Sequence, residues 1–182
     1  MRESTELQRE PTRALEEVIV VAPDGIVVHP IALPGLAGLT LAEGHIPPGE
    51  FGVHAHRSLE QITYVLAGRL IVTMGDPATG ATTEVVCAAG DVVSTPPVVT
   101  LSFRNPGPDL ARVLFICAPP YPPDDADTAL FERHRPLTAG EIRAAIARLD
   151  ETRAAVDAGF AARRAALETL LANAEGGTRN AE

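Results

Sequence analysis

Two histidines separated by one residue, His54 and His56, are the side chains in this sequence whose type and spacing best suit chemistry. They follow a Pro-Gly turn at residues 48–49 and precede a strong strand pattern at residues 61–66. Side chains two residues apart on a strand point to the same face, about 6.5 Å apart. The pair can therefore project together into a barrel interior and share one metal ion.

A carboxylate just past the pair could complete a metal site. Glu60 would add the third ligand of a two-histidine, one-carboxylate face, the kind that holds non-haem Fe(II) with open positions. Gln61 competes for the same role, because neighbouring residues of a strand face opposite sides and only one of the two can point inward. The predicted metal ligands, which are also the predicted catalytic residues, are His54, His56 and Glu60. If Gln61 is inward instead, the pocket has little charge to hold a divalent cation.

The segment resembles the first motif of the cupin superfamily, in which a glycine precedes H-x-H, a glutamate follows three or four residues later, and a glycine closes the strand. The run HAHRSLEQITYVLAG, ending at Gly68, is especially close to pirin-like and small single-domain bacterial cupins. Residues 90–105 match the second cupin motif in length. Two residues depart from it: Leu101 stands where the family has its third histidine, and Val98 where it has a glycine.

The resemblance covers about residues 35–118 and implies a mainly β cupin double-stranded β-helix barrel, or jelly roll. It also implies a small-molecule enzyme with one divalent metal ion, first of all Fe(II) and otherwise Mn, Ni or Zn, of the oxygenase, isomerase or lyase type. Leucine cannot coordinate a metal, so two other interpretations stay open. One is a metal-free acid–base catalyst of the epimerase or cyclase type. The other is a non-catalytic cupin that binds a metabolite and has a regulatory role.

Five further residues are candidates for contact with a ligand. Phe103 and Leu101 share a strand face and would make the pocket mostly apolar, which suits a small organic ligand. Gln61 would reach the pocket if Glu60 does not, and Tyr64 could present a phenol there. His45, on the preceding strand, could supply a replacement imidazole.

The order of segments predicts a barrel with additions at both ends. Short runs rich in Val, Ile and Thr, separated by Gly, Pro, Asn and Asp, indicate many short strands. We expect an arm at 1–15, the barrel at 16–120, a proline-rich linker at 121–137, a long α-helix at 138–175 and a tail at 176–182.

The predicted helix begins at a capping box, Thr138-Ala139-Gly140-Glu141, and carries apolar residues spaced by threes and fours. At about 35 residues it would be about 50 Å long. It therefore either breaks near Gly159 or projects to meet a second subunit, and packing against its own barrel is the alternative. Cupins are usually dimeric, so the resemblance adds to the expectation of a homodimer.

Composition excludes several functions. The net charge of −9 argues against nucleic acid as a partner. The sequence contains no lysine, which rules out a catalytic lysine. No apolar run is long enough to cross a membrane, and the charged N-terminus is unlike a signal peptide, so we expect a cytoplasmic protein with no membrane partner.

Overall fold

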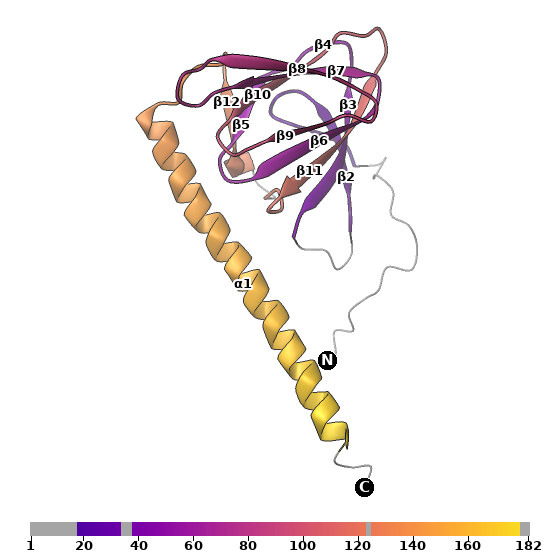
Figure 1. Ribbon diagram of the computed structural model, residues 1–182, viewed down its shortest axis with the longest axis vertical. Helices are drawn as coiled ribbons and strands as arrows, with labels where there is room; N and C mark the ends of the chain where they lie inside the picture. The colour runs from indigo at the N-terminus through magenta and orange to yellow at the C-terminus, as the bar shows by residue number, and fades with distance from the viewer. Residues whose placement is uncertain (1–17, 34–37, 123–124, 179–182) are drawn as a thin grey trace.

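The structure is a computed structural model that describes residues 18–33, 38–122 and 125–178. Figure 1 shows a β-barrel from which one long helix, α1, runs away diagonally. The mainly β fold and the C-terminal helix are as predicted from the sequence. The strands are β1 (Val20–Val21), β2 (Val27–Ile31), β3 (Thr40–Ile46), β4 (Gly49–Glu50), β5 (Val53–His56), β6 (Glu60–Ala67), β7 (Arg69–Gly75), β8 (Thr82–Ala88), β9 (Val92–Thr95), β10 (Thr100–Asn105), β11 (Ala111–Ala118) and β12 (Thr128–Phe131).

The strands form two antiparallel sheets that face each other. One sheet has the order β1-β2-β3-β11-β6-β9 and the other the order β12-β5-β10-β7-β8, with β4 paired to β10. Strands distant in the sequence are therefore neighbours, as in β3 beside β11 and β5 beside β10. This wrapping of two antiparallel sheets is a jelly roll.

Side-chain alternation sets which residues fill the barrel. On β11, Ala111, Val113, Phe115 and Cys117 are buried while the residues that alternate with them are more exposed. The core comes from both sheets and includes the fully buried Val72 and Leu101. Such one-sided burial is what an alternating pattern of β-branched and polar residues produces.

The segment predicted as a proline-rich linker contains two regular elements. A 3₁₀ turn, η1 (Asp125–Asp127), leads into β12, which pairs antiparallel with β5 along its whole length. Thr128 lies opposite His56 and Leu130 opposite His54. The chain thus returns to the histidine strand after leaving the barrel. The predicted arm at 1–15 lies outside the described residues.

Helix α1 (Ala139–Thr178) begins at the predicted capping box. The Glu141 backbone N–H donates to Thr138 Oγ1 at 3.3 Å, and the Thr138 backbone N–H donates to Glu141 Oε2 at 2.8 Å. These two bonds satisfy donors that a helix start leaves open. The helix does not break at Gly159. Its first turns contact the barrel through the buried Ala145, whereas every described side chain from 153 to 175 is exposed.

No helix in the described part of the chain has both the length and the apolar character needed to cross a membrane.

Candidate functional site

His54 and His56 both point into the barrel, each about 5% exposed. Strand β5 carries them two residues apart, and their rings meet edge to face with centroids 5.2 Å apart. They line a cavity of about 440 Å³ inside the barrel. Most of the other lining is apolar: Val20, Ala22, Pro23, Ile26, Val28, Pro30, Ala42, Phe103, Phe115 and Pro122.

Asp24 lies beside His54. The Asp24 side chain is 5% exposed, and its Oδ2 lies 3.3 Å from His54 Nδ1. This contact does not have the geometry of a hydrogen bond, and His54 Nδ1 is buried without a hydrogen-bond partner. A turn between β1 and β2 places Asp24 there: Gly25 has φ of +94°, a conformation that favours glycine, and the Asp24 carbonyl accepts from the Gly52 N–H at 3.0 Å. Because Nδ1 is directed at Asp24, Nε2 is the nitrogen of His54 left for a ligand.

His56 is held on both of its nitrogens. Its Nε2–H donates to Gln61 Oε1 at 3.0 Å, and the Gln61 amide in turn donates to Thr63 Oγ1 at 3.3 Å. Its Nδ1 lies 3.7 Å from Asp127 Oδ2, too far for a hydrogen bond. Both of these atoms are buried without another hydrogen-bond partner. His56 is thus fixed in place more tightly than His54 and has less freedom to contact a ligand.

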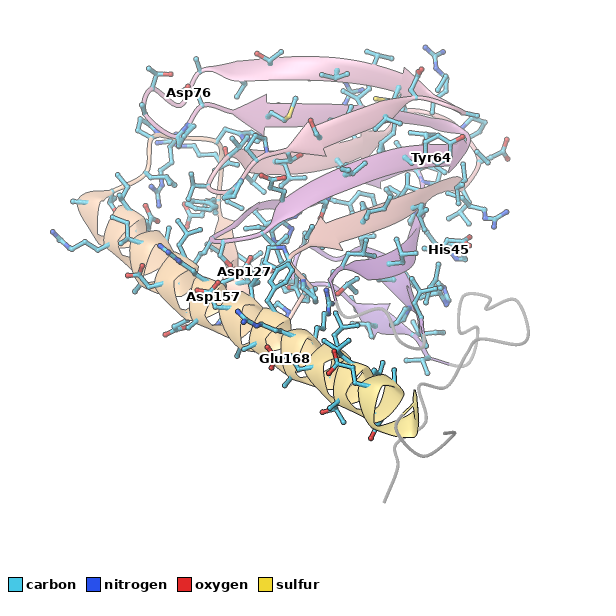
Figure 2. The ribbon with its side chains drawn as sticks, turned by 60° about the horizontal axis from the view of Figure 1, so that its bottom comes forward. His45, Tyr64, Asp76, Asp127, Asp157 and Glu168 are labelled. Atoms are coloured by element: carbon cyan, nitrogen blue, oxygen red, sulfur yellow. The ribbon has the colours of Figure 1, made fainter. Side chains whose placement is uncertain are left out.

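Asp127 joins the site to α1. It is fully buried and accepts from the Ser58 backbone N–H at 3.0 Å and from the Ser58 hydroxyl. The Ser58 hydroxyl also lies 2.8 Å from Thr152 Oγ1 of α1, and Arg148 Nε of α1 lies 3.7 Å from Asp127 Oδ1. Figure 2 shows Asp127 between the barrel and the helix. The start of α1 is therefore part of the shell around His56.

Burial shifts the titrating groups of the cavity toward their uncharged forms. It lowers the pKa of His54 to about 4, against a small opposing effect of the Gly52 backbone. It lowers the pKa of His56 to about 4 as well, helped by the charge of His54. Burial also raises the pKa of Asp24, although the hydrogen bond from the Ile26 backbone opposes this. At neutral pH both imidazoles are uncharged, and each can accept a proton on its second ring nitrogen.

Comparison with known proteins supports the fold. A family model described as the cupin domain matches residues 42–117, which include both histidines and most of the barrel. Residues 42–117 of the chain therefore form a cupin domain. A comparison with curated proteins found no match.

Solved structures similar to this cupin share its fold at low identity. A Lactobacillus farciminis oxalate decarboxylase in complex with formate has 20% identity and a TM-score of 0.51, over 66% of this chain and 33% of that one. CapF with the inhibitor 3-isopropenyl-tropolone has 17% identity and a TM-score of 0.52, over 67% of this chain and 35% of that one. A Klebsiella pneumoniae protein with a double-stranded β-helix domain has 21% identity and a TM-score of 0.48, over 65% of this chain and 94% of that one. At these identities the likeness is one of fold alone.

The cupin barrel decides between Glu60 and Gln61. Gln61 is 5% exposed and lines the cavity, whereas Glu60 is exposed on the other face of β6. The predicted ligands His54, His56 and Glu60 are therefore not brought together. The physical reason is the two-residue period of the strand, which turns Glu60 outward once Gln61 and Thr63 face in.

The other predicted ligand contacts divide between the two faces. Phe103 lines the cavity. Leu101 of β10 is fully buried, and its register partner is His54 of β5. Tyr64 is on the outward face of β6, and His45 bonds Glu43 Oε1 at 2.9 Å on the outward face of β3. Figure 2 shows Tyr64 and His45 on the outside of the barrel.

A cupin metal ion does not fit the residues present at the family's ligand positions. Leu101 and Gln61 occupy two of them, and neither supplies an anionic or imidazole donor. Across the described residues, no group of three or more His, Cys, Asp or Glu side chains could hold a metal ion. Two histidines alone leave a divalent cation with an incomplete protein ligand set.

Asp24 and Asp127 were missed by the sequence reasoning. Asp24 lies in the turn sequence APDG, and Asp127 lies in the expected linker. Gly52 offered a weak sign of Asp24, because a side chain there would press on the Asp24 backbone at 3.3 Å. A glycine two residues before H-x-H can thus mark a close backbone approach.

Proposed function

We propose that this cupin binds a small organic molecule in its barrel cavity and moves a proton on it, with His54 as the acid–base group. The observation that carries the proposal is a buried imidazole, with the Asp24 carboxylate 3.3 Å from its Nδ1, in an otherwise mostly apolar cavity. This is the metal-free alternative that the sequence left open. A general base works best when the atom that accepts the proton is fixed in orientation and water is excluded from its surroundings.

His54 suits this role better than His56. Gln61 already engages Nε2 of His56, while His54 directs Nδ1 at Asp24 and keeps Nε2 for a ligand. We assign His56 to positioning, since it packs edge to face on His54 and is anchored to Gln61.

The proposed step is proton abstraction from carbon next to a carbonyl group. The C–H proton moves to His54 Nε2, and the electron pair of that bond moves toward the carbonyl oxygen. The charge of Asp24, 3.3 Å from Nδ1, stabilises the imidazolium that forms. Return of the same proton to another carbon would complete an isomerisation.

The metalloenzyme that the resemblance first implied is not our proposal, because Glu60 faces outward and Leu101 replaces the third histidine. Its decisive measurement is metal content by mass spectrometry of untagged protein, wild type beside His56→Ala. A near-stoichiometric ion in the wild type that is lost in the variant would contradict the metal-free proposal and favour the metalloenzyme.

Proton transfer is tested by hydrogen–deuterium exchange at carbon. A panel of small aldehydes and ketones in D₂O would be followed by proton NMR with wild type, His54→Gln and, as a control, His45→Gln. We expect exchange faster than the buffer rate for some panel members with wild type and His45→Gln, and buffer rates with His54→Gln. Exchange that survives in His54→Gln would refute the assignment of His54.

We also propose that the protein forms a homodimer through α1. Its apolar residues form two series with seven-residue spacing that extend past the barrel, each interrupted once, by Arg163 in the first and by Arg153 in the second. All of the apolar members are at least 36% exposed: Ile142, Leu149, Val156 and Leu170, and Ile146, Phe160 and Leu167. Such a repeat is the seam of a coiled coil. A helix end without tertiary contacts is marginal in water, which favours a second copy as its partner.

A further inference from the structure

Among the described residues, no positively charged side chain lines the barrel cavity. The chain has no lysine, and none of the arginines in the described residues lines this cavity. Its polar groups are Asp24, the two histidines, Gln61, Thr40, Tyr121 and Thr128, with the thiol of Cys117 beside them. Of these, only the Asp24 carboxylate is charged in its usual form at neutral pH, and that charge is negative.

Several of these polar groups already have partners within the protein. Tyr121 and Thr128 share a hydrogen bond of 2.6 Å between their hydroxyls, and Thr40 Oγ1 accepts from the Tyr121 backbone at 2.8 Å. Gln61 is bonded to His56 and Thr63. Few polar contacts therefore remain for a ligand, and His54 Nε2 is the main one.

A carboxylate or phosphate entering this cavity would lose its hydration and meet Asp24, with no cation to compensate. Moving a charged group into such surroundings costs far more than moving a neutral one. The histidines do not supply the missing charge, because burial holds their pKa near 4 and leaves them neutral at pH 7.

We propose that the ligand is an uncharged and predominantly apolar molecule with one polar group for His54, and that the cavity rejects organic acids and phosphate esters. The inference rests on the proposed function only in taking this cavity as the ligand site. The aromatic faces of Phe103 and Phe115, 5.8 Å apart between centroids, favour a ring system in the ligand.

The test compares two probes that differ in charge and share one ring system. Methyl 2-naphthoate and 2-naphthoate would be titrated by calorimetry into the full chain at pH 7.5. We expect the ester to bind at least about tenfold more tightly than the anion, because the anion must be buried unpaired.

Two variants check that binding occurs in the cavity. Ala42→Phe adds a ring to the lining and should abolish ester binding, with an unchanged circular dichroism spectrum as the control for folding. Val28→Arg puts a cation on the half-buried Val28 position of the lining and should raise the affinity for 2-naphthoate relative to the ester.

Equal or tighter binding of 2-naphthoate to the wild type, lost in Ala42→Phe, would overturn the inference. So would a folded wild type that does not bind the ester. Ester binding without carbon exchange on any panel compound would remove proton transfer and leave this inference standing. Carbon exchange seen only with anionic carbonyl compounds would support proton transfer and overturn the inference that the ligand is uncharged.

Discussion

Acid should destabilise this barrel through its two buried histidines. His54 and His56 have a pKa of about 4 in the fold against 6.5 for a free histidine. Between these values the unfolded chain binds protons that the folded chain does not, so stability falls as pH falls from 6.5 toward 4. Each histidine should contribute a loss of about 2 kcal/mol between pH 7 and pH 5. Solvent screening reduces this little, because each histidine is only 5% exposed.

The assay is urea unfolding followed by circular dichroism at pH 7.0 and pH 5.0. The wild type should lose about 3–4 kcal/mol of unfolding free energy, and His54→Gln should lose about 2 kcal/mol less than the wild type does. The raised pKa of Asp24 acts in the opposite direction, but it is common to both proteins. His45→Gln removes a histidine outside the cavity and should keep the wild-type loss.

An equal loss of stability in wild type and His54→Gln would refute the reasoning. It would mean that His54 takes up its proton in the fold as readily as in the unfolded chain. The imidazole of His54 would then be mostly protonated below pH 6.5, where proton transfer requires a neutral base.

Three further substitutions test other parts of the structure. Asp127→Ala should lower the free energy of unfolding by about 3–5 kcal/mol, because it leaves the buried partners of Asp127 unpaired. Calorimetry would show this as a Tm lower by about 10 °C. As a control, substitution of the exposed Asp157 by alanine should change the Tm little. Val98, at the glycine position of the second motif, has φ of +62°, so Val98→Gly should raise the unfolding free energy by about 1 kcal/mol in urea; a lower value would show that the side chain of Val98 matters more than its backbone strain. Phe160→Glu should convert the dimer to monomer in gel filtration, and an unchanged elution volume would count against the α1 seam.

Restoring the metal ligands of the family is a separate test of the fit. Gln61→Glu with Leu101→His puts a carboxylate and a third imidazole beside His54 and His56, because Gln61 and Leu101 both face inward. The double variant should retain about one Ni²⁺ per chain through gel filtration. Metal analysis would check this, and equal retention by the wild type would contradict our view of the site.

The positions of the two histidines could be predicted from the sequence because they depend on local periodicity. A strand turns residues two apart to the same face whatever surrounds it, so His54 and His56 had to share a face. The capping box likewise depends on four consecutive residues, and α1 begins there. The succession of short strands predicted a barrel for the same reason.

Only the tertiary structure decided which face of β6 is inside. The alternation in the sequence is equally compatible with Glu60 or Gln61 in the cavity, and the choice follows from how β6 packs between β11 and β9. The outcome changes the chemistry, because it replaces a charged metal ligand by a neutral amide.

The two carboxylates beside the histidines also depend on long-range packing. Asp24 reaches His54 from a turn 30 residues earlier, and Asp127 reaches His56 from a segment 71 residues later. Neither sequence separation has a period that a local pattern could reveal. The sequence by itself determined that the two imidazoles share one face of a strand. The packing of distant segments determined their charge, orientation and partners, because electrostatics in a buried site depends on every group brought within a few ångströms.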